Sequence, residues 1–201
     1  MFALVESGSI TKMLNGNKGI QIGDLKYPRA IYTLWTEAER NAIGIYTVEY
    51  DDSNKKDEKW YINTNQSYAF GSGKVTATYG TATAKAHADA NFTAQDETDG
   101  LGTEGELKSR GLKYNLIQDV KLEAANELAK TDWYVVRKSE ESTAIPSAIT
   151  THRRLVRTKA AAMETSITNA SDTPALETLY TYTTDSDGVH SRPLAEIPTL
   201  D

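Results

Sequence analysis

The sequence contains no cysteine among its 201 residues. This absence excludes disulfide bonds, thiolate catalysis and metal centres held by cysteine sulfur. No apolar stretch is long enough for a transmembrane helix, and the first residues, MFALVESGSITK, lack the basic region of a signal peptide. We therefore expect a protein that is synthesised in the cytoplasm and has no membrane partner.

Basic residues are fewer than acidic ones, with 22 Lys and Arg against 28 Asp and Glu, for a net charge of -6. A negatively charged surface repels phosphate backbones, so we expect no nucleic-acid partner. Hydrophobic residues make up 39% and charged residues 25% of the chain, a balance that favours folded domains over a disordered chain.

Residues 1–82 have the pattern of a small β-rich domain. Short apolar segments, FALV, SITKML and GIQI, are separated by turn residues, of which Asn15 and Gly16 best suit a tight hairpin. Thr36 and Glu39 fit a capping box, in which each side chain bonds the backbone N–H of the other residue. We therefore expect one short helix that begins directly after Thr36.

The rest of the chain follows a different pattern. Residues 83–106 are rich in Gly, Ala and acidic side chains and are predicted to be a linker. Residues 107–182 are predicted to be a helical domain, because apolar residues recur on one face of two segments. These are Leu112, Leu116, Val120, Ala124 and Leu128 in the first segment, and Ile149, Leu155, Val156, Met163 and Ile167 in the second. Residues 183–201 are polar with two prolines and are predicted to be an extended tail.

The expected fold class is therefore α+β, with a β-rich N-terminal domain followed by a helical hairpin or bundle and an extended C-terminal arm. The stretch TDWYVVRK lies between the two apolar helical segments, and Thr131 is a cap-type residue at its start. Trp133 and Val136 are spaced to share a helical face, and Pro146 suits the first turn of the second segment. We predict that Trp133 and Val136 are buried at a packed corner of the hairpin, because aromatic residues at helical spacing are usually core. The alternative is that they line a site for a ligand or partner.

The sequence shows no catalytic constellation, so we expect neither an enzyme nor a bound cofactor. The three histidines have no second ligand at metal-binding spacing, and GSGK at residues 71–74 lacks the remaining residues of a phosphate-binding loop. A glycine-rich hairpin turn explains GSGK better. Glu97, Asp99 and Glu106 match three positions of a calcium-binding loop and are weak candidate ligands, against a solvated linker as the simpler interpretation.

Arg153, Arg154 and Arg157 form the only dense basic run of the chain. They are predicted to share an exposed side of the second helical segment, opposite its apolar stripe. A solvated face is the simpler interpretation, and docking to an acidic surface of another subunit is the functional one.

The segment from Leu122 to Ala170 resembles a helical module of tailed-bacteriophage virion and tail-fibre-associated proteins. The residues that carry the resemblance are Thr131, Asp132, Trp133, Val136, Arg137, Ile145, Pro146, Arg153 or Arg154, and Arg157. The loop SEESTAIP lacks the glycine that is common at this place in the module. The opening MFALVESGSI also resembles the first strand of many phage tail proteins.

The resemblance implies a structural component of a virion, in the tail, baseplate or fibre-attachment region. Its expected partners are other virion proteins and several copies of itself. Two alternatives stay open: a tail-fibre assembly chaperone that is absent from the mature virion, and a glycan-binding accessory protein that uses Trp60, Tyr61 and Tyr68.

Overall fold

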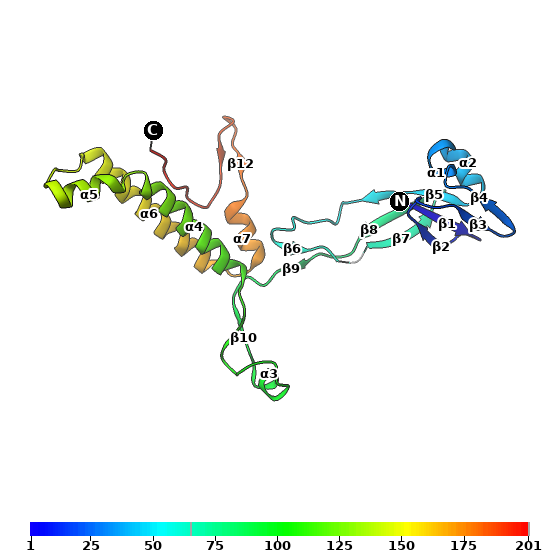
Figure 1. Cartoon of the computed structure of the whole chain (residues 1–201), viewed down its shortest axis with the longest axis horizontal. Helices are drawn as coiled ribbons and strands as arrows, with labels where there is room; N and C mark the ends of the chain where they lie inside the picture. The colour runs from blue at the N-terminus through cyan, green and yellow to red at the C-terminus, as the bar shows by residue number, and fades with distance from the viewer. Residues whose placement is uncertain (65, 201) are drawn as a thin grey trace. The chain divides into compact units, whose positions relative to one another are not determined.

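The computed structural model describes residues 1–64 and 66–200, and it divides into two compact units at residues 83 and 84. The first unit holds the larger sheet, and the second holds the long helices (Figure 1). The predicted α+β class is confirmed. Among the described residues, no helix combines the length and apolar character that crossing a membrane requires.

Five strands of the first unit form one sheet: β1 (Phe2–Glu6), β2 (Ser9–Leu14), β5 (Ile45–Asp51), β7 (Gln66–Gly71) and β8 (Lys74–Tyr79). Their order is β2-β1-β5-β8-β7. β5 and β8 are parallel, and the other neighbouring pairs are antiparallel. The remaining elements are β3 (Ile20–Ile22), β4 (Leu25–Tyr27), α1 (Ile31–Leu34), α2 (Glu37–Ala42), β6 (Tyr61–Ile62) and β9 (Thr83–Ala84).

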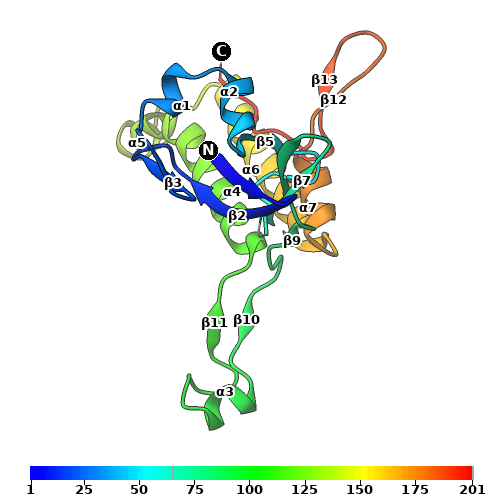
Figure 2. The same ribbon diagram turned by 90° about the vertical axis from the view of Figure 1, so that its right-hand side faces the viewer.

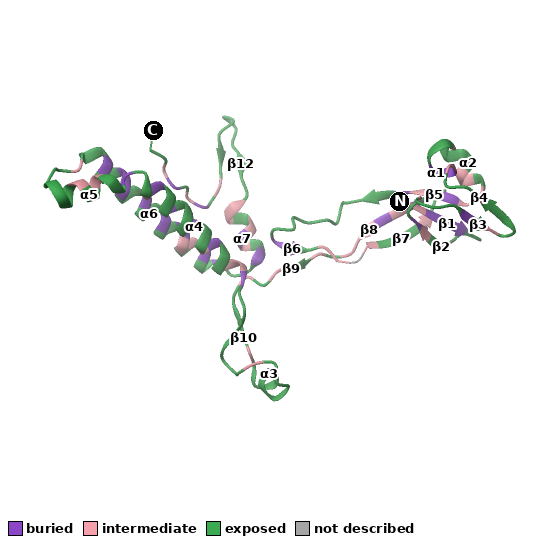
Figure 3. Cartoon of the chain, in the orientation of Figure 1, coloured by how far each residue is buried: buried purple, intermediate pink, exposed green. Residues whose placement is uncertain are grey.

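Both faces of this sheet carry an apolar cluster, because successive side chains of a strand point to opposite faces. In β1, Leu4 belongs to one apolar cluster, while Ala3 and Val5 belong to another. The first cluster also contains Leu14, Ile20, Ile31, Tyr32 and Ile45, and the second also contains Val48, Val75 and Ala77. Figure 3 shows buried residues in the central strands of the first unit.

The structure confirms the capping box and corrects one predicted turn. The Thr36 hydroxyl accepts a hydrogen bond from the Glu39 N–H at 3.3 Å, and the Glu39 carboxylate accepts from the Thr36 N–H at 2.7 Å. GSGK forms the predicted hairpin turn, between β7 and β8. The prediction of a tight hairpin at Asn15 and Gly16 is wrong. β2, which precedes these residues, pairs with β1 through a turn at Ser7 and Gly8, and it does not pair with β3.

The second unit begins with an arm, for which we use the name acidic arm, defined as residues 90–109. It consists of β10 (Ala90–Asn91), α3 (Ala94–Thr98) and β11 (Leu107–Ser109), and β10 pairs with β11. At its base, the Asp89 carboxylate accepts hydrogen bonds from the Arg110 guanidinium at 2.6 Å and from the Gly111 N–H at 2.8 Å. The predicted linker at residues 83–106 is therefore a folded hairpin with a helical tip.

Four helices follow: α4 (Leu112–Ala129), α5 (Asp132–Glu141), α6 (Ser147–Asn169) and α7 (Thr173–Tyr180). α4 and α6 pack as an antiparallel pair, with the Lys113 ammonium donating to the Thr168 carbonyl near one end and Arg153 donating to the Leu128 carbonyl near the other. Most predicted stripe positions are buried in this pair. Leu112 and Leu128 are partly buried, and Leu155, next to the buried Val156, is exposed.

The C-terminal segment is not the extended tail that its polarity predicted. β12 (Thr183–Thr184) and β13 (His190–Ser191) form a short hairpin, after which Leu194 and Ile197 are buried. The Leu194 N–H donates to the Leu179 carbonyl at 3.0 Å, and the Leu200 N–H donates to the Glu127 carboxylate at 2.8 Å. We call residues 192–200 the C-terminal strap, because they lie along the helices of this unit.

Candidate interaction surface

The turn between α4 and α5 is held by a buried polar residue. Thr131 is fully buried, and its hydroxyl donates to the Leu128 carbonyl at 3.0 Å, in the last turn of α4. The Tyr134 N–H then donates to the Thr131 carbonyl, which starts α5 in a new direction. The predicted corner residue Thr131 therefore fixes the bend by hydrogen bonds rather than by apolar packing.

Arg153 of α6 connects the two sides of this bend. Its Nη1 donates to the Leu128 carbonyl at 2.8 Å and to the Thr131 hydroxyl at 2.6 Å, and it lies 2.9 Å from the Asp132 carboxylate. A guanidinium suits this position because its planar donors satisfy several oxygens at once. Arg153 is only 8% exposed, so the prediction that it lies on an open docking face is wrong.

A second polar group lies one turn earlier, on α4. The Glu127 carboxylate is buried, and its Oε1 is 3.1 Å from His152 Nε2 and accepts the Leu200 N–H of the C-terminal strap. Its Oε2 accepts from the Lys130 ammonium at 2.6 Å. The hydrogen bond from Lys130 holds the pKa of the Glu127 carboxyl below its usual range, with a further contribution from the Leu200 N–H, while burial acts in the opposite direction. Glu127 therefore fastens the strap as a carboxylate.

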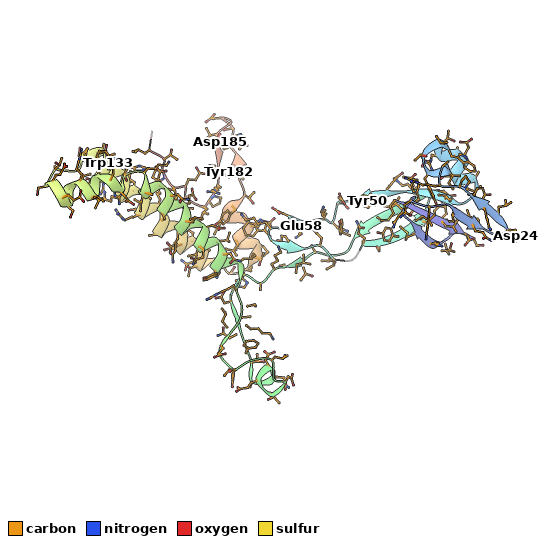
Figure 4. All side chains as sticks on the ribbon, in the orientation of Figure 1. Asp24, Tyr50, Glu58, Trp133, Tyr182 and Asp185 are labelled. Atoms are coloured by element: carbon orange, nitrogen blue, oxygen red, sulfur yellow. The ribbon has the colours of Figure 1, made fainter. Side chains whose placement is uncertain are left out.

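These contacts leave the outer face of α5 open to solvent. Trp133 is 51% exposed and Val136 is 52% exposed, so the prediction that they are buried is wrong (Figure 4). The Trp133 and Tyr134 rings lie 3.8 Å apart between centroids, and the Arg137 guanidinium lies over both, at 4.6 and 5.3 Å. Trp133, Val136 and Arg137 share one helical side, and we call them the α5 face.

The other predicted site residues are distributed as follows. Arg154 and Arg157 are exposed on α6, and Arg157 donates to the Arg153 carbonyl. Pro146 immediately precedes α6, in the N-cap position, so its missing N–H removes no helical hydrogen bond. Trp60 and Tyr61 are buried, which removes them as an open stacking platform for a glycan.

The candidate calcium ligands do not converge. Glu97 accepts a hydrogen bond from the Glu104 N–H, and Asp99 accepts one from the Gln95 side chain. Glu97 lies within α3, so this part of the chain is helical where a calcium loop would wrap around the ion. Within residues 1–64 and 66–200, no group of three His, Asp or Glu side chains could hold a metal ion.

No protein-family model, curated protein or solved structure matches this chain. The assignment of a function therefore depends on the residues themselves. The sequence missed Glu127 and His152, since a contact between residues 25 positions apart leaves no local signal.

Proposed function

We propose that this protein acts by protein–protein contact as a structural component of a tailed-phage particle, in its tail, baseplate or fibre-attachment region. The α5 face is the observation that carries the proposal. It presents an exposed Trp and a stacked Arg, the residue types that contribute most binding energy in protein interfaces. Its partners would be other virion proteins and further copies of the same chain.

The way in which α5 is held supports a binding role. Thr131, Asp132 and Arg153 fix the direction of the helix from its buried side, so the exposed side chains are presented without support from a hydrophobic core. A partner would then bind a preorganised face and would lose little conformational freedom on ordering it.

The residues that carry the phage resemblance fall into two groups on this basis. Thr131, Asp132 and Arg153 make the bend, while Trp133, Val136 and Arg137 make the open face. A module that contains both groups of residues has the bend and also the exposed surface that the bend presents. This division supports a contact function for the whole motif.

Mass spectrometry of purified particles from cells that express the protein tests the proposal. We expect the chain at a fixed, stoichiometric ratio to other virion proteins, and a variant with Trp133→Ala and Val136→Ala should be depleted from particles. The matched control is Leu122→Ala, which removes an exposed apolar side chain from α4 instead.

The same exposed face also suits a tail-fibre assembly chaperone, which must bind other chains transiently. If the protein is required for infectious particles but is absent from them, the chaperone function replaces the structural one. If it is neither present nor required, both are wrong.

A further inference from the structure

We propose that the α5 face of one copy binds the tip of the acidic arm of a second copy, in a head-to-tail contact. This inference deepens the proposed function, since it names one partner of the α5 face. It depends on the chemistry of the two surfaces and on their separation within the second unit.

The α5 face is apolar and carries a positive charge without an ionic partner. Among the ion pairs of the described residues, none involves Arg137 or its exposed neighbour Lys138. Arg137 instead stacks on Trp133 and Tyr134, which leaves a carboxylate partner to come from another molecule. Glu140 and Glu141 make the end of α5 acidic. The part of the helix that suits a carboxylate partner is therefore its first two turns.

The tip of the acidic arm has the opposite chemistry. Residues 92–107 contain no Lys or Arg, and four of their carboxylates are exposed: Glu97, Asp99, Glu104 and Glu106. In the part of the chain that the structure describes, these four form no ion pair. Leu101 lies among them in sequence and is 61% exposed, and Leu107 at the end of this range is 42% exposed. The tip therefore offers exposed apolar side chains together with negative charge.

The tip is also a built structure rather than a loose acidic loop. Thr93 and Asp96 form a capping box at the start of α3, and Asp96 accepts from the Lys108 ammonium of β11 at 2.6 Å. The Gly105 N–H donates to the Phe92 carbonyl, and the Phe92 N–H donates to the Glu106 carbonyl. Leu101 is thus presented on a folded tip, which lowers the entropic cost of docking it beside Trp133 and Val136.

The two surfaces of one copy cannot meet each other. The acidic arm joins the start of α4 and α5 follows its end, and the 18 residues of α4 separate these points by about 27 Å. Figure 1 and Figure 2 both show the arm projecting away from the helices. An arm that binds the α5 face must therefore come from another copy.

A contact between two different surfaces has a definite consequence for assembly. A pair joined by one such contact keeps one free face on one copy and one free tip on the other, so further copies can add and the contact produces rings or open chains. The surfaces are small, and a single contact should be weak. Repetition around a particle would strengthen it, because each added copy is held at a high local concentration.

Sedimentation velocity of the full-length protein at low salt, from about 1 to 300 µM, tests this inference over the range expected of a small interface. We expect wild type to form species larger than a dimer as concentration rises. A face variant, Trp133→Ala with Arg137→Glu, and an arm variant, Leu101→Ala with Asp99→Lys and Glu104→Lys, should each remain monomeric. Leu122→Ala should behave as wild type.

The decisive sample is an equimolar mixture of the two variants. The intact tip of the face variant fits the intact face of the arm variant, so the mixture should form one-to-one dimers and nothing larger. Monomeric wild type, association that either variant retains, or a mixture that stays monomeric would each overturn the inference.

Two further measurements test whether the variants fold and whether this inference and the proposed function stand independently. Far-UV circular dichroism should be the same for all variants, and Val136→Arg replaces the face variant if Trp133→Ala does not fold. If the chain is present in particles but does not associate with itself, the proposed function survives and this inference fails. If the chain associates with itself but is absent from particles, this inference survives and the proposed function fails.

Discussion

Arg153 and Arg154 are adjacent in α6 and have opposite environments. Arg153 is buried against three oxygens of the α4–α5 bend, whereas Arg154 is exposed. Arg153 lies four residues after Ile149 and three before Val156, so helical spacing places it on the apolar stripe and not opposite it. Spacing alone does not show why a charged side chain is buried there, because the oxygens that it binds belong to the α4–α5 bend.

At this position we expect Arg153→Ala to lower the free energy of unfolding by about 3 kcal/mol, because it removes a charged donor from buried oxygens. Arg154→Ala, one residue away, should change it by less than about 0.5 kcal/mol. Urea denaturation of the two variants measures both values. Similar values for both would contradict the role assigned to Arg153.

The tip of the acidic arm should respond to acid through the Asp96 carboxyl group. Lys108 first, and then the N–H and hydroxyl of Thr93, lower the pKa of Asp96 from 3.8 to about 2. A depressed pKa in the folded state stabilises the arm above the unfolded value, and this stabilisation is lost as pH falls from about 4 to 2.

NMR hydrogen-exchange protection of the Gly105 and Phe92 amides, measured against pH, tests this expectation. Protection should fall between pH 4 and 2 in wild type and should already be low at pH 6 in Asp96→Asn. Asp99→Asn serves as the control, since its carboxylate binds only the Gln95 side chain. An arm whose protection is unchanged in Asp96→Asn would show that the carboxylate does not hold it.

Interactions between residues close in the chain were predictable, and distant ones were not. Thr36 and Glu39 are three positions apart, so the capping box could be recognised from residue types alone. Glu127 is one of three acidic residues in α4, and nothing in its own helix distinguishes it from the other two. Its partners His152 and Leu200 come from other segments, and only the folded chain brings them together.

Among the elements, α4 and α6 were predictable because each has a long apolar stripe that a partner helix must cover. α5 was misplaced for a related reason. Its Trp and Val positions have helical spacing, but the inner side of the bend is already occupied by Thr131 and Arg153. Arg153 bonds to the Thr131 hydroxyl and the Leu128 carbonyl on this inner side. Trp133 and Val136 therefore face solvent.

The end of α5 contains a strained residue that a substitution can relieve. Ser142 follows the helix with φ of 58°, in the left-handed region that glycine adopts most easily. We expect Ser142→Gly to stabilise α5 by about 0.5–1 kcal/mol, seen as slower hydrogen exchange of its amides.

The same substitution inside the helix provides the control. Ser139→Gly should destabilise α5 by about 0.5 kcal/mol, because glycine has a lower helix propensity than serine. If both substitutions change the hydrogen exchange of the α5 amides in the same direction, the left-handed backbone at Ser142 does not explain the effect of Ser142→Gly.

At the scale of the molecule, the α+β class was predictable from composition and periodicity. The acidic arm and the C-terminal strap were not. The strands of the acidic arm and of the β12–β13 hairpin before the strap are two or three residues long, too short to show an alternating pattern. Leu194 and Ile197 are isolated apolar residues in a polar segment, and their burial depends on helices made much earlier in the chain.

The C-terminal strap should contribute to the stability of the whole second unit. Leu194→Ala is expected to lower the free energy of unfolding by about 3 kcal/mol, since it leaves a cavity at a fully buried position. Leu200→Ala is the control, with less than about 0.5 kcal/mol expected, because its side chain is exposed and its N–H to Glu127 is kept. Thermal denaturation compares them, and equal losses would contradict the expectation.

The position of the strap also sets an order of events during synthesis. α4 ends at Ala129, whereas Ile197 is added to the chain 68 residues later. At translation speeds of about 5–20 residues per second, this delay is roughly 3–14 seconds. During that time α4 lacks the apolar contacts that the strap supplies, and chaperones can bind the exposed surface.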